Sequence, residues 1–426
     1  MDQPSILSLF SHIAFMLAFA AALVLVAWNV WLTYINLVYL RSVEWILLEI
    51  TPPKDVFKSP EAMELVLNSL YGGGANNWFL KYWKGELSQF YSLEIASIEG
   101  QIHFYVRFHK KFKKVFEASL YAQYPQAEVK EVEDYVKNVP AYVTGGPISV
   151  FAYNIILNKE DPYPIKSYID YGLDRAIGSL DEEQRIDPIT PLLEIMGSIG
   201  TGEQIWIQII IRQDTKRFEV KTTKKVKKGE EEIEEVTVET GKSWKDKANE
   251  IIADLRKKID KQGAKPSKGQ LAVIDAIERH RNKYGFDAGM RAVYVADKDK
   301  FNGNTIGAFT AMFRQFNMED MNGFKLDKLS KSPDEPWNDL GGRKAEKLKR
   351  DYLDDYKARA FFYGGFDPKK AWKALITHPN KAGGKPFILS TEEIATVYHL
   401  PGRVASTPTF TRIEATKAEP PSNLPI

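Results

Sequence analysis

Residues 187–213, DPITPLLEIMGSIGTGEQIWIQIIIRQ, decide the fold class of this chain. The first part predicts a helix, because Asp187 and Thr190 can each cap a helix start and each is followed by a proline. The last part predicts a strand buried on one side, since every second residue from Ile205 to Ile211 is isoleucine. A helix leading directly into such a strand indicates a mixed α and β fold.

The turn between these two elements, GSIGTGE, resembles a nucleotide loop in composition. Phosphate loops run from a strand into a helix, so that the phosphate meets the helix N-terminus, and here the order is reversed. We therefore expect the glycines to end the helix. Because glycine lets another backbone approach closely, we also predict an interaction surface at Gly197, Gly200 and Gly202.

Upstream, residues 42–140 carry the order strand, helix, strand, strand, helix, strand. WILLEI at 45–50 predicts the first strand, and Ser59 with the following proline predicts the start of the first helix. YSLEIASI and IHFYVRF, joined at Glu99–Gly100, predict a hairpin. FKKVFEASLYAQYP at 112–125 predicts a helix, and EVKEVEDY a polar edge strand. This order is that of the ferredoxin-like split βαβ arrangement.

Downstream, residues 141–330 predict a second unit of the same kind. Its strands are expected from Ile148, in the 203–213 segment, from Met290 and, more weakly, at NGFKL. An insertion at about 214–286 interrupts this unit. We therefore predict an α+β fold with one N-terminal membrane helix and two tandem ferredoxin-like units.

The insertion begins with RFEVKTTKKVKKGEEEIEEVTVETG, which is basic in its first half and acidic in its second. A fold at 227–230 would set Lys224 and Lys225 beside the glutamates of 231–234, as in a hairpin with opposite charges facing each other. A disordered charged loop is the alternative. Two amphipathic helices, WKDKANEIIADLRKKI and KGQLAVIDAIERHRNKYG, are expected after it.

Within this insertion, VTVETGKSW at 236–244 has the strand, Gly-Lys-Ser, helix order of a P-loop. A P-loop also needs a glycine five positions before Gly241, where this chain has Val236. Valine resists the backbone conformations that glycine supplies, and Glu239 would place a carboxylate beside the phosphates. We therefore predict an ordinary connection in which Ser243 caps the following helix.

The composition limits the kinds of site that the chain can build. The 58 basic and 56 acidic residues give a net charge of +2, so no global field attracts nucleic acid. The chain has no cysteine, and its six histidines lack ligand spacing, which makes a metal centre unexpected. No pair of carboxylates stands out and no G-x-S-x-G motif occurs. We therefore predict a non-enzymatic protein with no catalytic residue and no cofactor.

The segment 12–40, HIAFMLAFAAALVLVAWNVWLTYINLVYL, predicts a membrane helix. No charged side chain lies between Asp2 and Arg41, and about 20 apolar residues suffice to cross the hydrocarbon core. Trp28, Trp31, Tyr34 and Tyr39 fit the aromatic belt at a membrane surface. A cleaved signal peptide and a buried core helix are the alternatives. The basic residues that follow the span place the large domain in the cytoplasm, so we predict a single-pass protein of the cytoplasmic membrane.

Residues 331–401 predict a helical and strand extension in which Ser390 and Glu393 form a capping box. Residues 402–426 contain several prolines and predict an extended tail. A preformed extended segment binds partners at low entropic cost, so the tail is our second predicted interaction surface, at Pro420, Pro421 and Pro425.

Two basic clusters suggest an alternative function, a membrane-tethered nucleic-acid-binding protein. Tyr352, Phe361, Phe362 and Tyr363 follow the second cluster and offer rings for base stacking. Charge runs on helices are more often solvated faces. The residues concerned are Lys110, Lys111, Lys113, Lys114, Arg343, Lys344, Lys347, Lys349 and Arg350.

Taken together, DPITPLLEIMGSIGTGEQIWIQIIIR, LSTEEIATVYHLPGR and KAEPPSNLP resemble the membrane-anchored N-terminal region of bacterial, largely candidate-phyla, relatives of type IV secretion and conjugation coupling ATPases. In those relatives an FtsK- or HerA-like motor with a P-loop follows a proline-containing linker. This chain contains no Walker A motif, so the ATPase activity is not carried over.

The resemblance implies a membrane-anchored, non-enzymatic adaptor of a type IV secretion or conjugation-like translocation system. Its expected partners are the lipid bilayer, a separate P-loop motor ATPase and other secretion components. Self-association into a homo-oligomer is left open.

Overall fold

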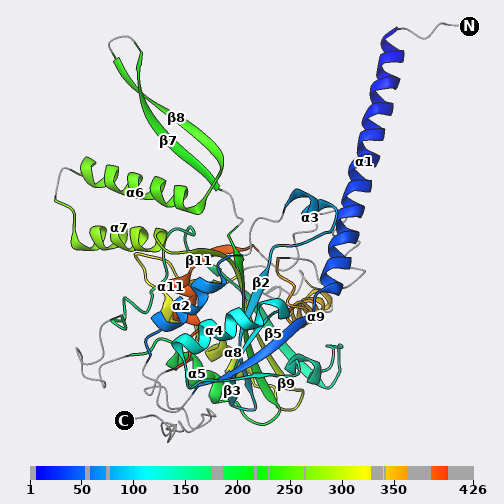
Figure 1. Cartoon of the computed structure of the whole chain (residues 1–426), viewed down its shortest axis with the longest axis vertical. Coiled ribbons are helices and arrows are strands. Elements are labelled where there is room, and N and C mark those ends of the chain that lie inside the picture. The colour runs from blue at the N-terminus through cyan, green and yellow to red at the C-terminus, as the bar shows by residue number, and fades with distance from the viewer. Residues whose placement is uncertain are drawn as a thin grey trace, which may run out of the picture.

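The computed structural model describes residues 6–52, 58–72, 77–174, 186–214, 218–228, 231–262, 265–327, 339, 342–362 and 385–401. The predicted mixture of helix and strand is confirmed. One long N-terminal helix leads into a body built on a nine-stranded sheet, whose strand pairs are all antiparallel (Figure 1).

The elements up to the end of the first half are α1 (Ile6–Ser42), β1 (Trp45–Thr51), α2 (Glu61–Leu70), α3 (Trp78–Tyr82), β2 (Phe90–Ile98), β3 (Gln101–His109), η1 (Lys110–Phe112), α4 (Lys113–Gln123), β4 (Glu128–Glu131) and η2 (Tyr135–Asn138). The second half contains β5 (Ile148–Leu157), α5 (Thr190–Gly197), β6 (Glu203–Gln213), β7 (Phe218–Lys228), β8 (Glu231–Lys242), α6 (Trp244–Lys261), α7 (Lys268–Arg281), β9 (Gly285–Asp297), α8 (Gly303–Ala311), η4 (Arg314–Phe316) and β10 (Phe324–Leu326). The last described elements are α9 (Arg343–Lys357), β11 (Phe387–Ser390) and α11 (Thr391–Val397).

The sheet has the strand order β10-β5-β9-β6-β2-β3-β1-β4, and β11 pairs with β9. In the first half, β1 lies between β3 and β4, and β2 pairs with β3. In the second half, β5 lies between β9 and β10, and β6 pairs with β9. The halves join where β2 pairs with β6, from Phe90↔Arg212 to Ile98↔Gln204. The sheet is therefore continuous through both predicted units, whose residue boundaries stay a prediction.

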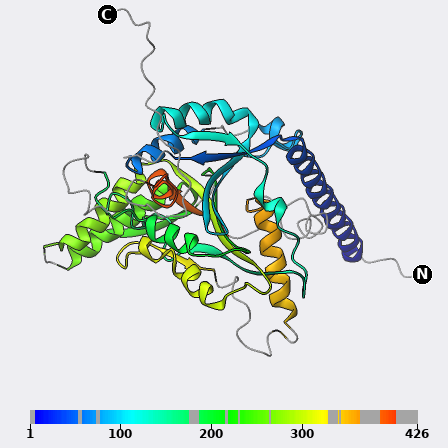
Figure 2. The ribbon, with the colours of Figure 1, turned by 90° about the horizontal axis from the view of Figure 1, so that it is seen from below.

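Helices and loops cover both faces of this sheet, and Figure 2 shows the two layers edge-on. Alternating side chains of β6 explain why both faces bury apolar surface. Ile205, Ile207, Ile209 and Ile211 are fully buried under one layer, which contains α2, α4, α5, α8 and α11. Trp206 is fully buried under the other, formed by α9 and residues 135–142.

Several predicted boundaries need correction. The helix α5 has Ile189 at its N-cap rather than Asp187 or Thr190, although the Asp187 carboxylate accepts the backbone N–H of Ile189. Pro60, not Ser59, occupies the N-cap of α2. The strand predicted from EVKEVEDY ends at Glu131 because the chain then turns into the short helix η2.

The described part of the insertion, residues 218–228, 231–262 and 265–281, forms a hairpin and a helix pair that we call the arm (Figure 1). The predicted hairpin is confirmed, with Lys225 opposite Glu234 in the backbone register. Ser243 caps α6 in a capping box with Asp246, as expected for an ordinary connection. Gln213 pairs directly with Phe286 at the base of the arm, so the whole insertion emerges from the end of one β-hairpin.

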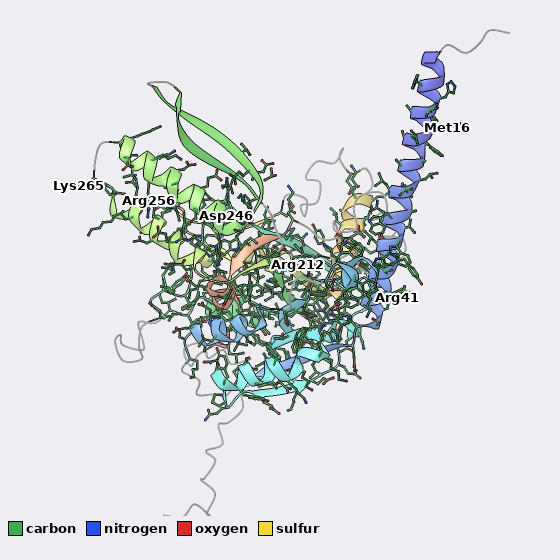
Figure 3. All side chains as sticks on the ribbon, turned by 45° about the horizontal axis from the view of Figure 1, so that its top comes forward. Met16, Arg41, Arg212, Asp246, Arg256 and Lys265 are labelled. Atoms are coloured by element: carbon green, nitrogen blue, oxygen red, sulfur yellow. The ribbon has the colours of Figure 1, made fainter. Side chains whose placement is uncertain are left out.

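The helix α1 is long and apolar enough to cross a membrane, and its most apolar window is not buried by the described protein. Figure 3 shows its side chains near Met16 projecting free of the body, with Arg41 at the body end. Ile35 and Leu40 are buried, so the last turns of α1 pack on the body. The exposure of the window disfavours the core-helix alternative.

Candidate functional site

A buried polar cluster lies where α11 meets α2, α7 and the segment 161–170. The short strand β11 pairs with β9 and places the start of α11 in the core, where the predicted capping box of Ser390 with Glu393 is confirmed. We call this group the α11 cluster and define it as Glu64, Ser167, Asp170, Arg279, His280, Lys283, Glu392 and Glu393.

Glu392 stands at the centre of the α11 cluster. Its Oε1 accepts hydrogen bonds from Ser167 Oγ at 2.6 Å and from Arg279 Nε at 3.2 Å. Burial raises the pKa of Glu392, while Ser167 and Arg279 act in the opposite direction. Burial opposes the charge on Arg279, but Glu392 and Asp170 beside it leave the pKa of the guanidinium raised. Arg279 therefore bridges two carboxylates from two different segments.

Glu64, on α2, makes a second set of contacts in the α11 cluster. One carboxylate oxygen accepts Lys283 Nζ at 2.7 Å and Thr391 Oγ1 at 3.3 Å, and the other accepts the Tyr168 hydroxyl at 2.8 Å. The carboxylate is buried, so these contacts replace the water that it would otherwise bind. Through Lys283 and Arg279, the C-terminal end of α7 is held on the body.

Glu393 and His280 are both fully buried, and His280 Nδ1 lies 3.2 Å from Glu393 Oε2 at an angle that makes no hydrogen bond. Glu393 instead accepts the backbone N–H groups of Ser390 and Ile165. Burial raises the pKa of Glu393 to about 8 and lowers that of His280 to about 3. At neutral pH the favoured state is therefore a protonated Glu393 beside a neutral imidazole.

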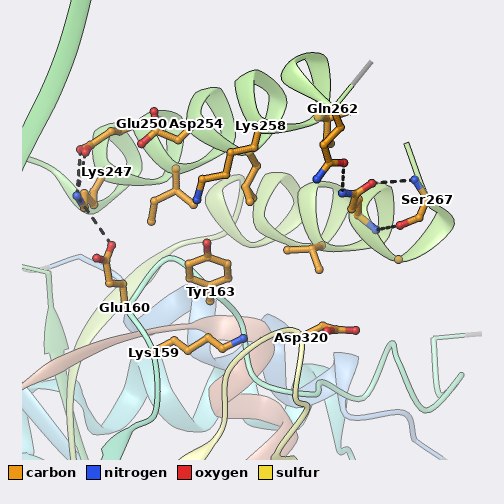
Figure 4. A pocket seen from close by; sticks show the side chains of 16 residues that line it. Lys159, Glu160, Tyr163, Lys247, Glu250, Asp254, Lys258, Gln262, Ser267 and Asp320 are labelled. Atoms are coloured by element: carbon orange, nitrogen blue, oxygen red, sulfur yellow. Dashed lines mark hydrogen bonds and ion pairs between the residues drawn. The ribbon is translucent and has the colours of Figure 1, made fainter. Parts of the chain in front are cut away.

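A groove of about 860 Å³ lies between the arm and the body, as Figure 4 shows. Apolar side chains of α6 and α7 line it together with charges of both signs. Lys247 pairs there with Glu250 at 3.1 Å and approaches Glu160 at 3.9 Å. The remaining lining includes Lys159, Tyr163, Ile251, Asp254, Leu255, Lys258, Ile259, Gln262, Val273, Gln270 and Asp320.

Ser167, Glu392 and Glu393 are almost fully buried, so a substrate has no direct access to them. The groove, in contrast, is open, and both apolar and charged side chains line it. Such a surface suits a polypeptide segment better than a small metabolite. Among the described residues, no group of three or more His, Asp or Glu side chains is arranged to hold a metal ion.

The predicted glycine surface is a packed turn at one end of the sheet. Gly200 N–H donates to Glu203 Oε2 at 2.8 Å, and Gly202 N–H donates to Glu99 Oε1 at 3.1 Å. Carboxylates of the protein thus occupy the two N–H groups. Gly202 has φ +81°, which explains why glycine stands there, and Gly197 ends α5 as expected. A role of the turn in binding stays a prediction.

The two basic clusters lie on opposite faces of the sheet. Lys110 and Lys111 lie in η1, and Lys113 and Lys114 begin α4, whose core residues pack on one face, whereas α9 packs its core residues on the other. Lys110 pairs with Glu44 at 2.5 Å, Lys113 with Glu131 at 2.8 Å, and Lys349 with Glu346 at 2.9 Å. One continuous basic patch is therefore not formed.

Two of the four stacking rings expected beside the second cluster were wrongly assigned, whereas Tyr352 is half-buried and its predicted role stays a prediction. Phe361 and Phe362 are 2% and 4% exposed and belong to the core beside Ile210, so they cannot stack on bases. Tyr363 and the predicted tail surface at Pro420, Pro421 and Pro425 lie outside the described residues.

Only the capping box indicated any part of the α11 cluster before the structure was known. Its members come from segments more than a hundred residues apart, such as Ser167 and Glu392. His103 is half-buried and contacts Glu49 at 2.6 Å. His399 contacts Asp187 at 3.0 Å. A histidine or glutamate inside an otherwise apolar segment, as in TEEIATVYHL, was the one available signal.

Residues 36–412 match a family described as Domain of unknown function (DUF8128). The match begins inside the part of α1 that packs on the body and includes both halves of the sheet, the arm and α11. No curated protein matches the chain.

Proposed function

The chain belongs to the DUF8128 family. We propose that it is a membrane-anchored adaptor that binds a partner protein rather than an enzyme. We further propose that this partner is a separate P-loop motor ATPase of a type IV secretion or conjugation-like translocation system. The resemblance carried by the 187–212 and 389–403 segments supports the kind of system. The groove beside the arm supports the kind of activity.

We infer that the two halves of the sheet are tandem ferredoxin-like units. The spatial orders β4-β1-β3-β2 and β10-β5-β9-β6 support this inference. In both, the strands of the half follow one another as fourth, first, third and second. In each half, helices follow the first and third strands. Ferredoxin-like units commonly serve as binding modules, although fold alone does not establish function.

The observation that carries the adaptor proposal is the way the arm is held. Arg279, on α7, and Lys283, just after it, reach Asp170, Glu392 and Glu64 on the body. Partly buried, charge-assisted contacts of this kind fix geometry more than they add stability. They keep the walls of the groove at a constant separation, which is what a preformed binding surface requires.

In this proposal, α1 holds the groove near a membrane. We propose that α1 is retained as a single membrane span and that the body faces the cytoplasm. The supporting observations are the exposed apolar window of α1 and Arg41 at its body end.

A pull-down from gently solubilised membranes tests the adaptor proposal. The wild-type protein should capture a P-loop ATPase, identified by mass spectrometry. Lys258→Glu, on the groove wall, should reduce that capture severalfold because it adds a carboxylate beside Asp254. Lys257→Glu is the matched control, since the neighbouring residue is equally exposed on α6 but does not line the groove.

Equal capture by the two variants would remove the groove from the proposal. Nucleotide hydrolysis by the purified protein alone would overturn the non-enzymatic adaptor as a whole.

A further inference from the structure

The segment 77–85, which contains α3, packs against the body end of α1. We call it the α3 segment. Trp31 Nε1 donates a hydrogen bond to the backbone oxygen of Tyr82 at 3.1 Å. The rings of Trp28 and Tyr82 stack with centroids 6.0 Å apart, and those of Trp31 and Trp83 meet edge-on at 6.0 Å. The α3 segment therefore sits at a defined height on α1.

Gly85 fixes this contact at the backbone level. Its φ of +66° favours glycine, and a Cβ at this position would lie 2.5 Å from the carbonyl carbon and oxygen of Ile35. Backbone atoms cannot move aside as a flexible side chain can. The close approach of the Gly85 and Ile35 backbones therefore requires glycine. This backbone contact holds the α3 segment where α1 enters the body.

The outer side of the α3 segment exposes large aromatic side chains. Trp78 is 63% exposed, Phe79 51% and Trp83 50%. Lys81 and Lys84 are exposed between and beside them. Three large aromatic residues within six positions form a concentrated apolar surface, unlike the single exposed apolar residues found elsewhere on the described body.

We propose that this surface lies in the headgroup and acyl boundary of the bilayer that α1 spans, as a second membrane contact. The inference rests on the membrane span of the proposed function, but not on the motor partner. Twenty residues of α1, from His12 to Trp31, rise about 30 Å, the thickness of the hydrocarbon core. Trp28 and Trp31 then lie at the membrane boundary, and the α3 segment touches the rings of both.

The chemistry of the α3 segment fits that depth. Tryptophan and phenylalanine favour the interface, where an apolar ring is buried while polar groups stay hydrated. Lysines beside them place ammonium groups at the level of lipid phosphates and are attracted to anionic lipids. Continuity with the aromatic residues of α1 favours the bilayer over a protein partner, because any occupant of this surface must also border the membrane.

Site-directed spin labelling tests the proposal on the full-length protein, and the absence of native cysteine makes single labels unambiguous. Single variants Phe79→Cys, Val24→Cys and Tyr121→Cys would be labelled and reconstituted at one protein per nanodisc containing phosphatidylcholine and phosphatidylglycerol. Power saturation compares collisions with oxygen, which partitions into lipid, and with a water-soluble nickel chelate. Val24 reports on the span, and Tyr121, exposed on α4, reports on water.

The expected result is that label 79 collides more often with oxygen than with the chelate, as label 24 does, while label 121 shows the reverse. If label 24 is in lipid and label 79 behaves like label 121, the second contact is refuted and the span stands. If label 24 also behaves like label 121, the span itself fails. A label 79 shielded from both reagents would show that protein covers the surface, which also overturns the proposal.

A second variant separates lipid binding from simple packing. Replacing Lys81 and Lys84 together with glutamine keeps the aromatic contacts to α1 and removes two charges. In discs with phosphatidylglycerol, label 79 should become severalfold more accessible to the chelate after this change. In discs of phosphatidylcholine alone the change should have little effect. The same response in both lipids would refute the role of the lysines in binding anionic headgroups.

Discussion

Arg359 and Glu94 form a two-point ion pair in which both side chains are fully buried: Nε lies 2.9 Å from Oε1, and Nη2 lies 3.0 Å from Oε2. Asp134 accepts one N–H from Nη1 and one from Nη2, the Lys357 carbonyl oxygen accepts another from Nη1, and the Tyr135 hydroxyl donates to Glu94. Burial alone would raise the pKa of Glu94, but the guanidinium holds it below its ordinary value. Arg359 also has φ +51°, an unusual backbone conformation for arginine.

Replacing Arg359 with methionine should lower the free energy of unfolding by about 3–5 kcal/mol, because it leaves the carboxylate of Glu94 buried without its partner. The double variant with Glu94→Gln should lose less than Arg359→Met alone, since the uncompensated charge is gone. Denaturant unfolding in detergent micelles measures both. A double variant that is less stable than the single one would contradict this account.

The stability of the protein should depend on pH through Glu393. Its pKa is raised to about 8, so the folded state holds a proton that the unfolded state releases near pH 4.5. The contribution of Glu393 to the free energy of unfolding is complete below about pH 4.5 and is lost as the pH rises towards 8. Between pH 5 and 8 the unfolding midpoint of the wild type should therefore fall relative to that of Glu393→Gln.

His280 provides the opposite slope in acid. Its pKa is lowered to about 3, so the folded state resists protonation that the unfolded state accepts near pH 6.5. Below pH 6.5 this histidine should destabilise the wild type progressively. His280→Gln, measured in parallel with Glu393→Gln, should remove the acid-side loss only; an unchanged acid slope would exclude His280 as its source.

Gly202→Ala should destabilise the fold by about 1–2 kcal/mol, because φ +81° is costly for a residue with a side chain. The new Cβ would also lie 2.7 Å from Asp297 Oδ2. Gly200→Ala is the control, since its Cβ would meet only Glu203 Oε2 at 3.6 Å. If Gly200→Ala keeps its stability yet loses partner capture, the predicted interaction surface at this turn gains direct support.

Ser243→Ala should cost about 1 kcal/mol of stability, because it removes the side-chain cap of α6.

We expect no nucleotide binding by the wild-type protein around Lys242. Lys242→Ala should therefore leave any background nucleotide signal unchanged in equilibrium dialysis. ATP binding by the wild type that is lost in Lys242→Ala would show that the 236–243 segment binds nucleotide.

Local patterns predicted most of the elements of this fold. The alternation of isoleucines from Ile205 to Ile211, the charge reversal about residue 229 and the capping boxes each depend on residues within one segment. Such patterns can be recognised in a single sequence because their spacing is set by the geometry of one helix or strand.

Contacts between distant segments were not predictable in the same way. Nothing near Arg359 indicates that its partner is Glu94, 265 positions away, and Ser167 meets Glu392 across 225. The nucleic-acid alternative required exposed rings at Phe361 and Phe362, but both rings are buried. The sequence could not separate the two cases, since an aromatic pair is equally typical of a core. The α3 segment also passed unnoticed, since its importance depends on where α1 lies beside it.

The pairing of β2 with β6 has a mechanical consequence. Tension applied at the arm enters the sheet through β6 and β9 and leaves through β3 and β1, whose first residue follows α1 after only Val43 and Glu44. Strands lying side by side carry such a load in shear, with the whole ladder of hydrogen bonds resisting at once. A partner that pulls on the arm would therefore tilt α1 together with the sheet.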